Sequence, residues 1–111
     1  MHVSTSSSVS EKAAEQFKAL GHPARLQIMQ TLAQRESCVC GEIVEVIGLA
    51  QSTVSQHLKV LKQAGLIQGT VDGQRSCYCI DRKAVAALQN ATASLCASWT
   101  GPSAQSDETC C

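Results

Sequence analysis

The chain has 111 residues, which is enough for one small domain and too few for a large multi-domain enzyme. Hydrophobic residues make up 44% of it but aromatic residues only 3%, so the core must be built from Ala, Leu, Ile and Val, which favours helices over a β-sandwich. Nine Lys and Arg residues balance nine Asp and Glu residues, so any basic surface has to be local.

The seven cysteines are the most unusual feature of the composition. An odd number, with C-x-C spacings and one adjacent pair, fits metal binding or redox sensing in a reducing compartment better than a secreted disulfide framework. The sequence shows no run of about 18–20 apolar residues, as a spanning helix needs, and no secretory signal. We therefore expect a cytoplasmic protein that does not associate with membranes.

Polar residues at both ends predict flexible tails, residues 1–9 and 99–111, around a folded unit of residues 10–98. Ser10 is predicted to cap a first helix with an apolar face that includes Leu20, and Gly21 stops this helix. Pro23 then starts a second helix as a first-turn residue, with Leu26, Ile28, Met29 and Leu32 inside.

A helix-turn-helix pattern follows. Ser37 is predicted to cap a short third helix that closes at Gly48, and a fourth helix runs from Gln51 or Ser52 to Ala64, where Gly65 ends it. The fourth helix is expected to bury Val54, Leu58 and Leu61.

Two β-prone runs, residues 66–70 and 76–80, come next and flank a turn that contains Asp72-Gly73, which predicts a hairpin. Beyond it lies an Ala-rich last helix whose apolar stripe, with almost no charge, is formed by Val85, Leu88, Thr92, Leu95 and Trp99. Such a stripe must pack on its own domain or on a second copy of the chain.

The fourth helix has a polar face rich in short donors and acceptors. Gln can pair with an adenine edge, and Ser and Thr can contact base edges or phosphates in the major groove. We predict DNA contacts for Gln51, Ser52, Thr53, Ser55, Gln56, His57, Lys59, Lys62 and, at the hairpin tip, Arg75. Between residues 52 and 83 five cations (Lys59, Lys62, Arg75, Arg82, Lys83) outnumber two anions (Asp72, Asp81), which indicates a local basic surface. The alternative is an ordinary amphipathic helix with a solvated polar face.

Cys38 and Cys40 are predicted to lie in the first turn of the third helix, where unpaired N–H groups and the helix dipole favour thiolates. Residues i and i+2 of a helix point to different sides, so one ion could join both sulfurs only if the helix start distorts. Core packing of two small thiols is the alternative. Cys77 and Cys79 share one face of the second hairpin strand, and packing is favoured over a second thiolate pair.

Packing is also the default for Cys96, on the last helix. Cys110 and Cys111 differ because a polar tail offers no core, so they form a soft-ligand site, a redox pair or a chance feature of the terminus. We find no nucleophile with its base, no paired carboxylates and no phosphate loop, and a thiol oxidoreductase would need a Cys-x-x-Cys on a βαβ scaffold. No enzyme activity and no organic cofactor are expected.

Three stretches together resemble the ArsR/SmtB family of metal-responsive winged-helix repressors, over about residues 11–98. They read LGHPARLQI at residues 20–28, SCVCGEI at 37–43 and QSTVSQHLKVLKQAGLI at 51–67. The resemblance implies a mainly α winged helix-turn-helix with a β-hairpin wing. It also implies a homodimer joined by the first and last helices, which represses an operon by binding an inverted repeat of double-stranded DNA. The interface would contain Phe17, Leu88, Leu95 and Trp99.

The resemblance also bears on the inducer. The zinc-type site of the last helix is absent, because residues 81–90 contain no His. Cys38-Val39-Cys40 is like the site of arsenite-responsive members, which implies release by trivalent arsenic (arsenite or methylarsenite) or antimonite. Those members commonly carry a third Cys where this chain has Ile43, so either Cys110, Cys111 or Cys96 completes the site or two thiols suffice. A redox- or persulfide-sensing repressor and a cadmium- or lead-responsive one are the alternatives.

Overall fold

The computed structural model describes residues 8–35, 39–40, 47–72 and 75–101. In these ranges no helix combines the length and the apolar character that a membrane crossing requires. The elements, in chain order, are α1 (Ser8–Leu20), α2 (Pro23–Ala33), β1 (Val39–Cys40), α4 (Gln51–Gln63), β2 (Ile67–Asp72), β3 (Arg75–Ile80) and α5 (Arg82–Thr100). The predicted mainly α class with a hairpin is confirmed. The last helix continues to Thr100, slightly beyond the boundary expected at residue 98.

The starts and ends of the helices follow local chemistry. His22 has an extended backbone, its Nδ1 accepts a hydrogen bond from the Ala24 N–H at 3.1 Å, and Pro23 occupies the first turn of α2, as predicted. Gly65 has a φ of 84°, a value that glycine adopts without strain. The Leu66 N–H then bonds to the Leu61 carbonyl at 3.0 Å, so the chain turns directly from α4 into β2.

The sheet has three strands in the order β1-β3-β2, and both pairings are antiparallel. The predicted hairpin is confirmed, although its strands reach further toward the tip, to Asp72 opposite Arg75. Strand β1 was not predicted. The expectation that Cys40 lies in the first turn of a helix is wrong, because Cys40 lies on β1, opposite Cys77. Residues 36–38 and 41–46, which hold Cys38 and Ile43, are outside the described residues.

The core lies between α1, α2, α4 and the hairpin. Its fully buried large side chains are Ile28, Leu61, Leu66 and Val54, and Leu58 is buried beside them, as expected for α4. Leu26, predicted to be inside, is 50% exposed. The periodicity missed Gln16, which is 3% exposed and donates from Nε2 to the Ala64 carbonyl at 3.1 Å. This hydrogen bond satisfies a buried polar group and ties α1 to the end of α4.

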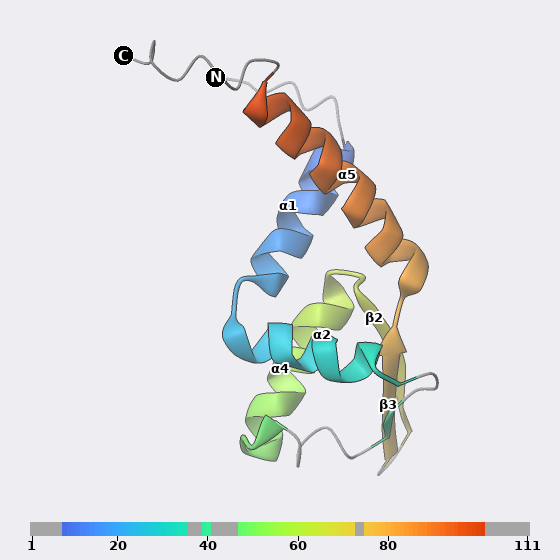
Figure 1. Cartoon of the computed structure of the whole chain (residues 1–111). Helices are drawn as coiled ribbons and strands as arrows, with labels where there is room; N and C mark the ends of the chain where they lie inside the picture. Colours follow the sequence, from blue (N-terminus) through green and yellow to red (C-terminus); the bar gives the residue numbers. More distant parts are fainter. Residues whose placement is uncertain (1–7, 36–38, 41–46, 73–74, 102–111) are drawn as a thin grey trace.

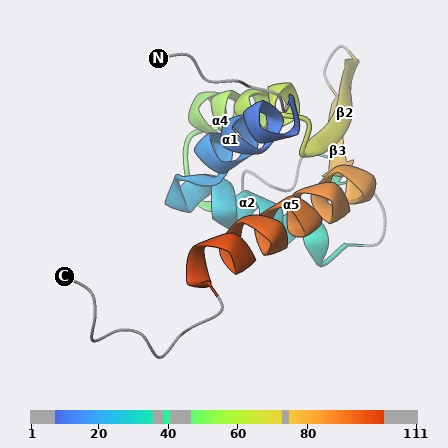
Figure 2. The same ribbon diagram turned by 90° about the horizontal axis from the view of Figure 1, so that it is seen from above.

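The arrangement of elements separates two ends of the molecule. In Figure 1, α4 begins at the lower end and the β2–β3 hairpin turns at the same end, whereas α1 and α5 occupy the upper end. Seen from above, the hairpin lies to one side of the helices, beside the start of α5 (Figure 2). The start of α4 and the tip of the hairpin can therefore meet one ligand together.

Gly69 of β2 allows a close approach to β3. It lies opposite Tyr78, and a Cβ added here would collide with the Cys77 carbonyl oxygen and the Tyr78 ring. We expect Gly69→Ala to lower the free energy of unfolding by about 1–3 kcal/mol, measured by urea denaturation.

The matched control is Gly21→Ala, because a Cβ there meets the Phe17 carbonyl oxygen at an ordinary 3.4 Å. That change should stay within about 0.5 kcal/mol of the wild type. Equal stability of the two variants would show that the hairpin tolerates a side chain at residue 69.

Candidate nucleic-acid interface

The polar face of α4 is exposed because its apolar face is anchored in the core. Val54, Leu58 and Leu61 are buried. The residues at intervening positions face solvent, and the exposed members of the predicted DNA-contacting set are Gln51, Ser52, Ser55, Gln56, Lys59 and Lys62. Side chains three and four residues apart share one side of a helix, so these six form a continuous polar surface that we call the α4 face.

The first turn of α4 adds backbone donors to this surface. The residue before it, Ala50, makes no capping hydrogen bond with its side chain, and no acidic residue stands in the first turn. The first N–H groups of a helix lack partners within it, and the helix dipole is positive there, so such an end attracts phosphate groups. The α4 face therefore combines side chains that are chemically able to bond to base edges with backbone donors suited to phosphate groups.

His57 behaves differently from its predicted role. It is half-buried, and its ring lies against that of His22, with centroids 4.5 Å apart and planes at 53°. The contact joins α4 to the start of α2, so the ring faces a neighbouring helix. Thr53 is also half-buried, which places these two predicted contacts at the edge of the α4 face.

The predicted basic surface divides into two parts. Lys59 and Lys62 belong to the α4 face, but Arg82 and Lys83 begin α5, beyond the end of β3 that is away from the hairpin tip. Arg82 donates from Nη2 to the Arg35 carbonyl at 3.5 Å. Because a six-residue strand spans about 20 Å, the cations at the start of α5 lie far from Arg75, the first residue of β3.

The described cysteines fall into two environments. Cys40 is paired with Cys77 across the β1–β3 ladder, and Cys77 and Cys79 are half-buried and both disulfide-bonded, where simple packing had been favoured. Cys96 is a free, exposed thiol on α5. The other predicted ligands, Cys38, Cys110 and Cys111, lie outside the described residues. Within the part of the chain that the structure describes, no three His, Cys, Asp or Glu side chains come together as a ready metal site.

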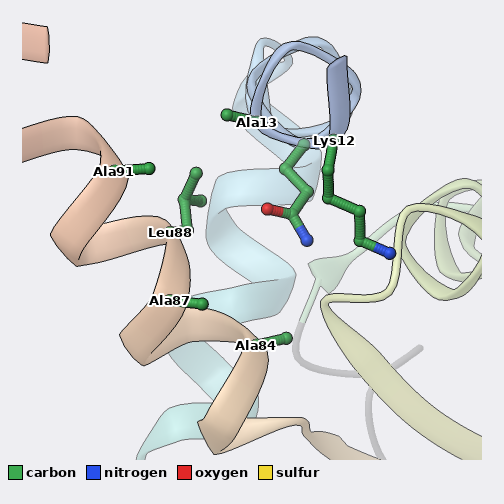
Figure 3. Close-up of a pocket in the computed structure, with 7 residues that line it drawn as sticks. Lys12, Ala13, Ala84, Ala87, Leu88 and Ala91 are labelled. Atoms are coloured by element: carbon green, nitrogen blue, oxygen red, sulfur yellow. The ribbon is translucent and has the colours of Figure 1, made fainter. Parts of the chain in front are cut away.

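The residues predicted for a dimer interface differ in exposure. Phe17 is 39% exposed and Trp99 71% exposed, and Leu95 is half-buried. Leu88 is only 9% exposed, because it belongs to the core of its own protomer. It lines a groove of about 360 Å³ between α1 and α5, together with Ala13 and Ala91 (Figure 3).

An exposed polar helix followed at once by a hairpin whose tip reaches the same end of the molecule is the arrangement of a winged helix-turn-helix protein. Residues 22–68 match the family model described as "Bacterial regulatory protein, arsR family". The chain is 45% identical over 71 residues to an uncharacterized HTH-type transcriptional regulator of Methanocaldococcus jannaschii, covering 63% of this chain and 79% of that protein. The chain therefore belongs to the ArsR family of helix-turn-helix transcriptional regulators.

Two further relatives are informative. The arsenical resistance operon repressor of Bacillus subtilis is 39% identical over 85 residues, which cover 76% of this chain and 80% of that protein. The solution structure of a homodimeric winged helix-turn-helix DNA-binding domain from Mycobacterium bovis has a TM-score of 0.62 and 31% identity, covering 85% of this chain and 90% of that one.

The α4 face yields a direct prediction. Ser55→Ala or Gln56→Ala removes an exposed polar group without touching the core, so each should weaken operator binding by about 1–3 kcal/mol, roughly ten- to a hundredfold. Fluorescence anisotropy with labelled promoter DNA measures the effect.

Gln68→Ala is the matched control, since Gln68 is also exposed but lies on β2, outside the α4 face. Its affinity for DNA should match that of the wild type. An equal loss of DNA affinity in all three variants would indicate a general effect on folding and not the loss of base contacts.

His57 should make stability depend on pH. Burial lowers the pKa of His57 below 6.5, and repulsion from His22 and Arg25 lowers it further. As the pH falls through 6.5 the unfolded chain takes up this proton first, so the contribution of His57 to stability is complete above that pH and declines below it. We expect His57→Gln to lose less stability than the wild type between about pH 7.5 and about pH 5.5, measured by urea denaturation. An identical loss in both proteins would contradict this assignment.

Proposed function

We propose that this ArsR-family transcriptional repressor binds double-stranded operator DNA as a homodimer, with the α4 face of each protomer in the major groove. The observation that carries the proposal is the α4 face itself, which is exposed, polar and anchored from behind by Val54, Leu58 and Leu61. A two-fold dimer would place its reading helices about 34 Å apart, one turn of DNA, on a pseudo-palindrome.

The homodimer is supported by two observations. The Mycobacterium bovis structure, at 31% identity, is that of a homodimeric domain. In this chain the exposed aromatic residues Phe17 and Trp99 lie on α1 and α5, the helices at the end away from the start of α4. An interface there leaves both α4 faces free for DNA.

We further propose that trivalent arsenic, as arsenite or methylarsenite, or antimonite releases the DNA by binding Cys38 and Cys40. The Cys-Val-Cys spacing supports this, and so does the similarity to a Bacillus subtilis protein named as an arsenical resistance operon repressor. Thiolates are the ligands that soft metals and metalloids prefer. Such a sensor would work in the cytoplasm, where operator DNA and reduced thiols occur together.

The position of β1 suggests how binding would reach the DNA. Cys40 lies on a strand that is hydrogen-bonded to β3, and β3 is one half of the hairpin beside α4. A ligand that draws the thiols together would therefore shift the hairpin relative to the α4 face. Binding of the inducer would then weaken the binding of DNA, and binding of DNA would weaken that of the inducer by the same free energy, typically about 1–3 kcal/mol.

A redox- or persulfide-sensing repressor is the second candidate, because Cys77 and Cys79 are both disulfide-bonded. Cadmium and lead are further candidates for the same thiolates. Reductant separates these functions: a metal or metalloid sensor needs reduced thiols, whereas a redox sensor releases DNA when it is oxidised.

The test is anisotropy of the reduced protein on its own promoter DNA, titrated separately with arsenite, methylarsenite, antimonite, cadmium, lead and a persulfide donor. We expect Cys38→Ser and Cys40→Ser to bind DNA like the wild type and to lose release by arsenite. Cys96→Ser, which removes an exposed free thiol, is the matched control and should respond normally. Normal release in either of the first two variants would overturn the site, and release by the persulfide donor alone would establish the redox function.

A further inference from the structure

The proposed inducer site lacks a ligand for inorganic arsenite. Trivalent arsenic forms three bonds, and the Cys-Val-Cys motif supplies two thiols. The inference below rests on the proposed function and asks which residue supplies the third sulfur.

The strand register brings another pair of cysteines to the motif. Cys40 on β1 lies directly opposite Cys77 on β3. Residues opposite each other in an antiparallel ladder have Cα atoms about 4.5–5.5 Å apart. Cys79 follows Cys77 by two residues, so the two share one face of β3.

The disulfides provide a second, independent observation. Cys77 and Cys79 are each bonded to another cysteine, and a disulfide needs Cα atoms within about 7 Å. Of the two strands that flank β3, β2 (IQGTVD) contains no cysteine, whereas β1 (VC) contains Cys40. The sulfurs of Cys77 and Cys79 each lie within bonding distance of another cysteine sulfur, and sulfurs that close can share one ligand once they are reduced.

The face that carries these thiols is also open to a ligand. Tyr78 and Ile80, which alternate with the two cysteines along β3, pack against the hydrophobic core. Cys77 and Cys79 therefore lie on the opposite face of the sheet and are half-buried there. A small uncharged species such as arsenous acid can reach that face without opening the core.

We propose that β3 supplies the missing ligand: Cys77, directly opposite Cys40 and with Cys79 beside it, completes a three-sulfur site for arsenite with the Cys-Val-Cys motif. Reduction of each disulfide takes two electrons and two protons. A thiol reductant supplies both, whereas a phosphine supplies the electrons and leaves as its oxide, with the protons and the oxygen coming from water. Arsenous acid then exchanges its three As–O bonds for three As–S bonds, and the three thiol protons leave with the hydroxide groups as three molecules of water. No electrons are transferred in that second step.

The experiment uses the full chain, reduced with a phosphine and loaded with arsenite. Arsenic K-edge X-ray absorption counts the bound sulfurs: we expect three in the wild type and two sulfurs with one oxygen in Cys77→Ser/Cys79→Ser. Arsenite should bind this variant about tenfold more weakly or worse, since one arm of the chelate is lost, while methylarsenite, which needs two thiols, should bind as before.

The matched controls separate the competing donors. Cys96→Ser and Cys110→Ser/Cys111→Ser should both keep three sulfurs on arsenic. Three sulfurs that persist in the β3 variant, or that fall to two in the tail variant, would overturn the proposal and leave the proposed function standing. A wild type that binds no trivalent arsenic would overturn both.

A measurement on the wild type avoids any dependence on how well the variants fold. Arsenite should protect Cys77 from alkylation by N-ethylmaleimide, read by mass spectrometry of the peptides, and should leave Cys96 as reactive as in the free protein. Protection that spares Cys77 and covers a tail cysteine instead would contradict the assignment.

Discussion

Strand β3 is hydrogen-bonded on both of its edges, and this double pairing connects β1 to the hairpin beside α4. On one edge it pairs with β2 to make the hairpin, and on the other it pairs with β1, which carries Cys40. Backbone hydrogen bonds hold register firmly where one face of the sheet is buried, and here Tyr78 and Ile80 pack against the core. A shift of β1 would therefore reach the hairpin through the backbone hydrogen bonds of β3.

The reading helix is fixed by a different set of contacts. Val54, Leu58 and Leu61 bury one side of α4, and the hydrogen bond from Gln16 to the Ala64 carbonyl holds its end against α1. The positive φ of Gly65 then lets the chain turn straight into β2. The connection between α4 and the hairpin is consequently short. A movement of the hairpin would therefore change its position relative to the α4 face.

The local parts of this fold could be predicted from the sequence. Apolar spacing, Pro23, Gly65 and the Asp-Gly turn identified α1, α2, α4 and the hairpin, because each depends on neighbours a few residues away. The α4 face followed from the same spacing. Because one side of α4 is buried, the other side must face solvent. Six of the eight polar positions predicted on α4 are exposed as expected, whereas Thr53 and His57 are half-buried.

The predictions that were wrong or missing concern contacts between residues far apart in the chain. Strand β1 has two residues and exists only through its pairing with β3, so Ser37 before the Cys-Val-Cys motif looked like a helix cap. The contact of His57 with His22 and the burial of Gln16 likewise need a partner from another helix. Arg82 and Lys83 are separated from the other predicted cations by the length of β3. The spacing of residues in the sequence does not show that separation in space.

In both proposed functions the inducer would act on β1 and β3, so the same strand pairing serves a metalloid sensor and a redox sensor equally well. A disulfide or an arsenic–sulfur bridge between β1 and β3 would draw cysteine sulfurs together, so either one would constrain β1 against the hairpin. They cannot occupy one sulfur at once, because the disulfide has already used the bond that arsenic needs. On the proposed mechanism, inducer binding and oxidation would compete for the same thiols, and the reduction state of β3 would set how much of the protein is able to capture a metalloid.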